Sequence, residues 1–171
     1  MKKSLVLTGM MGVGKSTIGR LLAKKLNLKF IDIDKIIEKQ EKKSITKIFE
    51  LKGETYFRKL EEKTTIKALK GNISVFALGG GAFINKSVRK EVLKTSCSVW
   101  LSLKIELLIK RYNKNKNRPL LNTGNLEKNL KKIYYSRKKI YSLANYKVNC
   151  DNVEKFKIVD EIIKMYEKHC S

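Results

Sequence analysis

Residues 9–16 of the chain, Gly9-Met10-Met11-Gly12-Val13-Gly14-Lys15-Ser16, match the P-loop pattern G-x4-G-K-[ST]. An apolar run at 4–8 precedes them and predicts a buried strand, and apolar residues at helical spacing follow from Lys15. In a P-loop the backbone N–H groups point at phosphate oxygens, and the helix N-terminus adds positive potential. A tight glycine turn between strand and helix is the structural alternative. The context favours a nucleotide-binding loop, in which Lys15 reaches the phosphates and Ser16 coordinates Mg²⁺.

The rest of the chain alternates short apolar runs with helical patterns. Further strands are expected at 29–32, 73–78, 98–101 and 146–150, and helices at 15–27, 36–41, 45–51, 54–69, 88–93, 106–111, 126–143 and 153–167. This order predicts a parallel sheet that is covered by helices on both faces. Segment 112–125 is polar, has no periodicity and holds the only proline, so we expect a mobile excursion there. A length of 171 residues fits a single domain.

Charge and composition exclude several classes of protein. The net charge of +23 could attract nucleic acid, but the lysines are spread along the whole chain without interleaved aromatic residues. A lysine-rich solvated surface is therefore the favoured interpretation, and a nucleic-acid-binding module remains the alternative. No run of 18 apolar residues occurs, and the three cysteines and the single histidine, His169, form no zinc or redox spacing. We expect a cytoplasmic protein that binds neither membrane nor nucleic acid.

The P-loop alone does not say which kind of nucleotide enzyme this is. The Asn-Lys pairs at 85–86 and 115–116 lack the aspartate that a guanine-reading Asn-Lys-x-Asp motif requires. The expected third strand ends in Gly79-Gly80-Gly81 and carries no carboxylate, whereas a helicase or motor ATPase would place an acidic residue there. A small-molecule phosphotransferase is the favoured subclass.

Asp32 and Asp34 lie at the end of the expected second strand, where ligands bind in parallel sheets. Residues two apart on a strand point to the same side, so both carboxylates can face one cleft. One carboxylate could hold Mg²⁺ through water, and the other could accept hydrogen bonds from the hydroxyls of an acceptor. The alternative is that Asp34 caps the helix that follows it.

Two further patterns point to an acceptor site. Arg58 and Glu61 stand three residues apart on a predicted helix, so they share a face and Glu61 can orient the guanidinium; an ordinary surface ion pair is the alternative. Three consecutive glycines at 79–81 follow a strand and permit a ligand to contact bare backbone, where a simple turn would need one or two.

Taken together, these motifs resemble the shikimate kinase family. The set consists of Gly-x-Met-Gly-x-Gly-Lys-Ser-Thr at 9–17, Asp-x-Asp at 32–34, Gly-Glu-x-x-Phe-Arg-x-x-Glu at 53–61, the glycines at 79–81, Arg-Pro-Leu-Leu at 118–121 and Arg-x-x-x-Tyr at 137–141. The order and spacing of the set are kept over nearly the entire chain. The resemblance implies a three-layer α/β P-loop fold with a five-stranded parallel sheet in the order 2-3-1-4-5, an acceptor-binding segment at about 33–61 and a lid at about 112–125.

The resemblance also implies an activity: transfer of the γ-phosphate of ATP to the 3-hydroxyl of shikimate, on the route to chorismate and the aromatic amino acids. It implies one Mg²⁺ ion and a monomer. A related kinase acting on a sugar acid such as gluconate is the rival enzyme interpretation. The four arginines that the resemblance places in the site are four of only six in the chain, and their planar forks suit a carboxylate and a triphosphate.

Site residues follow from the resemblance position by position. Shikimate would be held by Asp34, Arg58, Gly79, Gly80, Gly81 and Arg137, with Asp34 as the candidate base. ATP would be held by Gly12, Val13, Gly14, Lys15, Ser16, Thr17, Arg111 and Arg118, with Arg111 against adenine and Arg118 closing over the phosphates. Catalysis would rest on Asp34, Lys15 and Arg118, and magnesium on Ser16 and Asp32.

The chain departs from the family pattern at three places. Glu41-Lys42-Lys43 stands where a glycine is often found, the segment Leu143-Ala144-Asn145 lacks two acidic positions, and no proline occurs near the fifth strand. These differences concern the adenine side and leave the phosphate and acceptor motifs intact.

Overall fold

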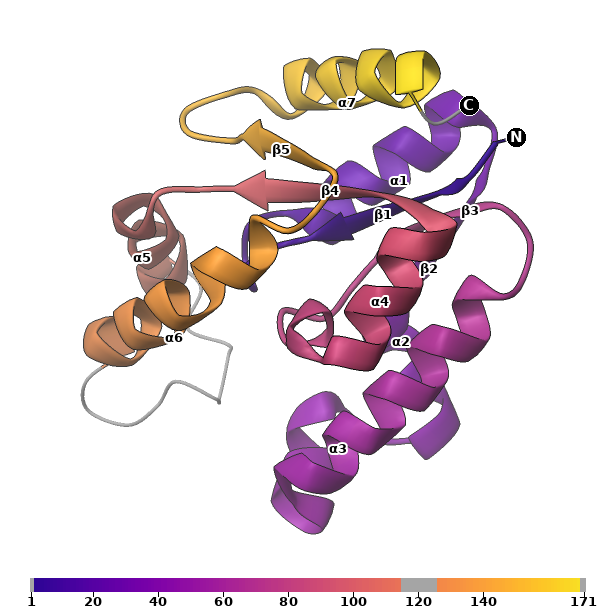
Figure 1. The fold of residues 1–171 in the computed structure, drawn as a ribbon. Helices are drawn as coiled ribbons and strands as arrows, with labels where there is room; N and C mark the ends of the chain where they lie inside the picture. The colour runs from indigo at the N-terminus through magenta and orange to yellow at the C-terminus, as the bar shows by residue number, and fades with distance from the viewer. Residues whose placement is uncertain (1, 115–125, 170–171) are drawn as a thin grey trace.

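Five parallel strands form the centre of the molecule, in the computed structural model that describes residues 2–114 and 126–169 (Figure 1). They are β1 (Ser4–Thr8), β2 (Lys29–Asp32), β3 (Ser74–Ala77), β4 (Ser96–Ser102) and β5 (Tyr146–Asn149). Their order in the sheet is β2-β3-β1-β4-β5. All five expected strands are present, and the expected order is confirmed.

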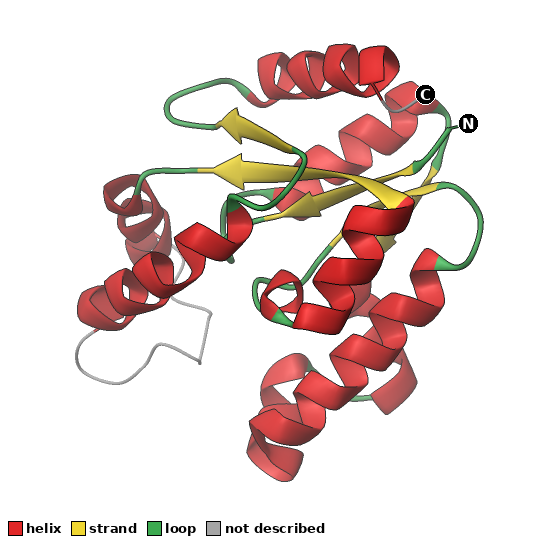
Figure 2. Ribbon diagram, viewed as in Figure 1, coloured by secondary structure: helices red, strands yellow, loops and turns green. Residues whose placement is uncertain are grey.

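Helices cover both faces of this sheet (Figure 2). They are α1 (Lys15–Leu26), α2 (Ile33–Glu41), α3 (Ile45–Leu69), α4 (Lys86–Thr95), α5 (Ile105–Lys114), α6 (Leu126–Tyr141) and α7 (Lys155–His169). Helices α1 and α7 contact each other on one side, whereas α4 packs against β4 and α3 on the other. A short 3₁₀ turn at Ala82–Ile84, which the sequence did not predict, follows the three glycines. None of the described helices is long and apolar enough to cross a membrane.

Strand β1 lies at the middle of the core because every one of its residues is buried. It pairs with β3 through Leu7 and Ala77 and with β4 through Thr8 and Trp100, so its carboxyl end is fixed from both sides. In Figure 1 the arrowheads of β1, β4 and β5 point toward α5 and α6. The P-loop, which begins at Gly9, therefore opens at the carboxyl edge of the sheet, where ligands bind in open α/β folds.

Helix α2 begins earlier than the sequence predicted. It starts at Ile33, and its N-cap is Asp32, whose side chain accepts a hydrogen bond from the Lys35 backbone N–H at 3.4 Å. Asp34 is therefore not the cap, and it lies in the first helical turn and not on the strand. The two carboxylates still reach one cavity, because the strand passes into the helix between them.

The long helix α3 is two helices joined at a break. Gly53 has φ 77° and ψ 169°, a conformation outside the helical region, and the chain resumes a helix on the other side. The expected separation of 45–51 from 54–69 is confirmed. Arg58 and Glu61 lie on the second half, in the turns that follow the break, and both line the cavity described below.

Gly9 is the tightest point of the loop that follows β1, and it provides the first prediction. It has φ +132°, and a Cβ there would come within 2.6 Å of the Leu101 carbonyl oxygen. Gly14 is also at positive φ (+108°), but it has open space around it. In Gly9→Ala, backbone strain at positive φ should by itself lower the free energy of unfolding by about 1–3 kcal/mol. The clash with the Leu101 carbonyl oxygen should add to this loss. Urea denaturation of Gly9→Ala against Gly14→Ala measures the difference, and equal losses would contradict the steric argument.

Candidate functional site

Two cavities share a wall at the carboxyl edge of the sheet. The first, about 290 Å³, is lined by P-loop residues 11, 12 and 14–17 and by Asp32 and Asp34. The second, about 510 Å³, is bounded by charged groups from four elements together with the glycines at 79–81. Met11, Ser16, Asp32, Asp34 and Gly80 line both cavities. Most of the sequence-predicted residues that the structure describes thus lie along one continuous hollow, whereas Val13 and Arg111 line neither cavity.

The P-loop closes around the Lys15 ammonium. The Lys15 side chain runs back along the loop, where Nζ donates to the carbonyl oxygens of Gly9 at 2.8 Å and Met10 at 2.9 Å. The Gly14 amide precedes the first turn of α1, and Ser16 and Thr17 lie within that turn. The loop therefore presents a positive charge and the N-terminus of helix α1 to the first cavity.

Arg111, at the end of α5, is tied to the same loop. Its Nη1 donates to the Val13 carbonyl oxygen at 3.0 Å, and the ring of the neighbouring Tyr112 lies against Gly12. The base of the segment that follows α5 is thereby fastened to the P-loop. Residues 115–125, and with them Arg118 and most of the expected lid, lie outside the described part of the chain.

Hard oxygen donors converge beside Lys15. The Ser16 hydroxyl donates to Asp32 Oδ2 at 2.7 Å, so a hydroxyl and a carboxylate stand together at the junction of the two cavities. Oxygen donors of this kind, with one carboxylate and room for phosphate oxygens and waters, fit Mg²⁺. The donor set is thus compatible with the expected magnesium site.

Asp34 stands where both cavities meet. Burial raises the pKa of its carboxyl, and the negative charge of Asp32 raises it further, while Lys15 and Arg58 oppose the shift. A carboxylate with a raised pKa is a stronger proton acceptor than an exposed one. Its position and its basicity suit a group that receives a proton from a hydroxyl in the second cavity.

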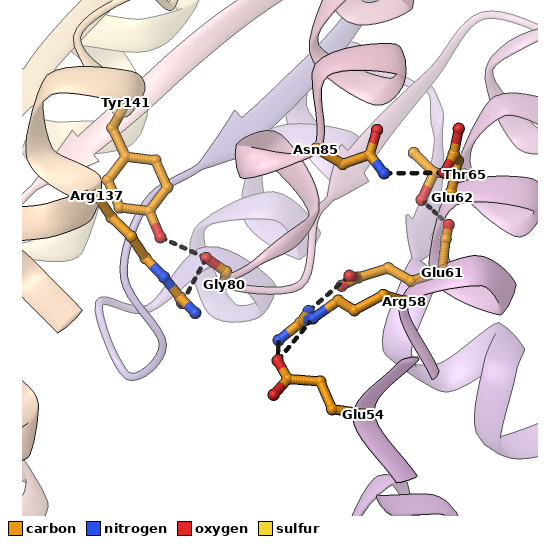
Figure 3. A network of polar contacts seen from close by, with 9 residues as sticks. All are labelled: Glu54, Arg58, Glu61, Glu62, Thr65, Gly80, Asn85, Arg137 and Tyr141. Carbon is orange, nitrogen blue, oxygen red and sulfur yellow. Dashed lines mark hydrogen bonds and ion pairs between the residues drawn. The ribbon is translucent and has the colours of Figure 1, made fainter. Parts of the chain in front are cut away.

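Arg58 forms one side of the second cavity, and two carboxylates orient it (Figure 3). Its Nη1 donates to Glu61 Oε2 at 2.7 Å, and its Nε and Nη2 both donate to Glu54 Oε1 at 3.2 Å. The Glu61 side chain is 3% exposed, whereas that of Glu54 is 67% exposed. Because Glu54 is a surface group, a ligand carboxylate can replace it at the Nε–Nη2 edge, while the buried Glu61 keeps its place.

Arg137 and Tyr141 reach the site from α6. Arg137 Nη1 donates to the Gly80 carbonyl oxygen at 3.0 Å, and the Tyr141 hydroxyl donates to the same oxygen. Figure 3 shows Arg137 and Arg58 on opposite sides of Gly80. The second cavity is therefore flanked by two guanidinium groups, which is the arrangement that a small acid requires.

The three glycines make room for the protein's own side chains. A Cβ at Gly79 would lie 2.5 Å from Glu61 Oε1 and 2.7 Å from Asp34 Oδ1, and a Cβ at Gly81 would overlap the Arg58 guanidinium. Neither glycine has a positive φ. The need for glycine here comes from close approach of charged groups, a reason that the sequence could not reveal.

Some site residues received no role from the sequence. Tyr141 was quoted only as part of a motif, and the apolar wall formed by Ile45, Phe49 and Phe57 was not foreseen. The adjacent pair Phe57-Arg58 could have suggested an apolar surface beneath the guanidinium. The second ring of that surface belongs to Phe49, whose centroid lies 4.6 Å from that of Phe57. Phe49 precedes the break in α3, so local sequence does not connect the two rings.

The crowding at Gly79 yields a second prediction. Gly79→Ala should push the Asp34 and Glu61 carboxylates apart and lower the free energy of unfolding by about 1–3 kcal/mol. Gly71→Ala is the control, since its nearest atom is the Ala68 carbonyl oxygen at 3.3 Å, and it should cost clearly less. Thermal or urea unfolding of the two variants provides the measurement, and a neutral Gly79→Ala would refute the crowding.

Comparison with known proteins agrees with this geometry. The family model for shikimate kinase matches residues 11–167. The chain is 41% identical over 161 residues to the shikimate kinase of a Sulfurihydrogenibium species, covering 94% of this chain and 96% of that one. It is 38% identical over 168 residues to the shikimate kinase of Bartonella quintana, covering 98% and 80%.

Solved structures give the same result. Shikimate kinase from Acinetobacter baumannii in complex with shikimate superposes with a TM-score of 0.92 at 31% identity, covering 98% of this chain and 94% of that one. The enzyme from Aquifex aeolicus gives 0.85 at 34% identity, with 96% of each chain covered. A gluconokinase from Sinorhizobium meliloti gives 0.62 at 16% identity over 99% and 94%, a likeness of fold alone. The chain belongs to the shikimate kinase family.

Proposed function

We propose that the chain transfers the γ-phosphoryl group of ATP to the 3-hydroxyl of shikimate, giving shikimate 3-phosphate and ADP. The observation that carries the proposal is the position of Asp34, which lines both the P-loop cavity and the cavity between Arg58 and Arg137. A hydroxyl placed against Asp34 lies between a phosphate cradle and a carboxylate socket. The whole chain would act as one catalytic domain, and the expectation of a monomer stays a prediction.

The acceptor half-site suits shikimate, which has one carboxylate and a set of neighbouring hydroxyls. Arg58 and Arg137 would bind the carboxylate, with the Nε–Nη2 edge of Arg58 supplying two parallel hydrogen bonds in place of Glu54. Asp34 and the backbone at 79–81 would bind the hydroxyls. The apolar wall of Ile45, Phe49 and Phe57 would face the carbon ring.

The donor half-site suits a nucleoside triphosphate. Residues 12–17 would hold the phosphates, and Lys15 would exchange its two carbonyl partners for phosphate oxygens. Arg111 would lie near adenine, and Arg118 would close over the phosphates from the segment at about 112–125. Lys15 and Arg118 would neutralise the charge that spreads over the transferred group.

Ser16 and Asp32 would hold Mg²⁺. The ion, when bound, would withdraw negative charge from the phosphate groups. Asp34 would accept the proton of the attacking hydroxyl, and its raised pKa matches that role. Positioning supplies most of the acceleration, because phosphoryl transfer asks little covalent chemistry of the protein.

The decisive test is ADP release from ATP and Mg²⁺ with and without shikimate. Wild type should turn over only with shikimate, and Asp34→Asn should reduce kcat about 10²- to 10⁴-fold because the base is lost. A panel of sugar acids, gluconate included, serves as the control. Turnover with gluconate and none with shikimate would overturn the assignment, as would full activity of Asp34→Asn.

Arg58→Lys tests the acceptor socket. The substitution keeps the positive charge but removes the fork, so shikimate affinity should fall by about 2 kcal/mol or more, roughly thirtyfold in Kd. Nucleotide affinity should stay within twofold. Arg20→Lys is the matched control, because this guanidinium lies over the Phe30 ring outside both cavities. Titration calorimetry measures the Kd of both ligands. Unchanged shikimate affinity in Arg58→Lys would contradict the assignment of Arg58 to the acceptor carboxylate.

A further inference from the structure

Glu61 has one oxygen that the proposed reaction leaves unused. Oε2 is paired with Arg58, but Oε1 is buried and has no hydrogen-bond partner among the described residues. A buried carboxylate oxygen without a donor is costly, because it has lost its water and gained nothing in return. The Glu61 side chain lines the acceptor cavity, so the unfavourable unpaired oxygen lies at the place where the acceptor would bind.

The unpaired oxygen faces a second carboxylate across Gly79. Glu61 Oε1 and Asp34 Oδ1 lie 2.5 Å and 2.7 Å from one and the same point above Gly79, so they cannot be more than about 5 Å apart. Two negative charges at this separation, both largely removed from water, repel each other. One proton placed on Oε1 would remove the repulsion and give that oxygen a hydrogen to donate.

Positive groups oppose the effect of burial on Glu61 in the empty cavity. Arg58 lies on α3, the helix that carries Glu61, and Arg137 acts on Glu61 from α6. Tyr141, also on α6, is close enough for the charge of Glu61 to raise its pKa. Burial and Asp34 raise the pKa of Glu61, while Arg58 and Arg137 lower it. The charge state of Glu61 therefore depends on the two guanidinium groups that the acceptor would also use.

We propose that Glu61 takes up one proton from solvent when a carboxylate acceptor binds between Arg58 and Arg137. The inference rests on the proposed function. The acceptor carboxylate takes the place of the exposed Glu54 at Arg58 and adds negative charge beside Arg137, inside a partly dehydrated cavity, so the two cations offset the charge of Glu61 less than before. Protonated on Oε1, Glu61 is neutral, and the Oε1 hydroxyl can donate toward Asp34. Glu61 is thus a positioning residue whose protonation keeps three negative carboxylates from sharing Arg58 and Arg137 in one pocket.

The test is calorimetric titration of shikimate into the protein at pH 7 in buffers of different ionisation enthalpy. The slope of the observed enthalpy against the buffer enthalpy gives the number of protons taken up. Wild type should take up a measurable fraction of a proton, and Glu61→Gln should take up none while still binding. Glu62→Gln is the matched control, since Glu62 is the next residue on α3 and accepts from Asn85 at 2.9 Å outside the cavity. It should behave as wild type.

The outcomes separate the inference from the function. Buffer-independent enthalpy in wild type, or uptake that persists in Glu61→Gln, would overturn the inference and leave the kinase assignment standing. Absence of shikimate binding in wild type would overturn both.

A wild-type measurement covers the case in which Glu61→Gln does not fold. Proton uptake requires the affinity for shikimate to weaken as pH rises, by up to about tenfold per pH unit for a full proton. An infrared difference spectrum on adding shikimate should also gain a protonated-carboxyl band. A flat affinity profile or a missing band would refute the proposal.

Discussion

The burial of β1 between β3 and β4 is the constraint on which the site depends. All five residues of β1 are buried, and the strand ends at the carboxyl edge of the sheet. The loop that begins at Gly9 turns there, close to the Leu101 carbonyl oxygen. The same edge receives Asp32 from β2 and the glycines that follow β3. A phosphate-binding loop and an acid-binding pocket are neighbours because neighbouring strands end together.

Charge balance is the second principle of the site. The acceptor cavity brings Asp34, Glu61, Arg58 and Arg137 together within a partly dehydrated space. Buried ions of this kind are tolerable only as compensated sets, since each desolvated charge is expensive alone. Glycines at 79 and 81 permit that compensation, because the carboxylates and the guanidinium occupy the space that a side chain at these positions would fill.

Periodicity in the sequence predicted the parallel sheet and nearly every helix, whereas the order of the strands came from the resemblance to the shikimate kinase family. It also identified Asp34, Arg58 and Arg137, which the structure brings to one cavity. It missed the early start of α2, since a residue that ends a strand can also cap the next helix. The sequence could not explain why glycine is needed at 79 and 81, nor predict the hydrogen bond from Tyr141 to Gly80. Both depend on contacts between residues far apart in the chain, which no local pattern predicts.

Asp32 divides its two oxygens between two helices. Oδ2 accepts from Ser16 at the start of α1, and Oδ1 caps α2, the helix that carries Asp34. One small side chain thus sets the spacing between the first turns of both helices. The phosphate side and the acceptor side of the pocket are therefore joined through a single carboxylate, and a substitution at Asp32 would remove a contact from the start of both helices at once.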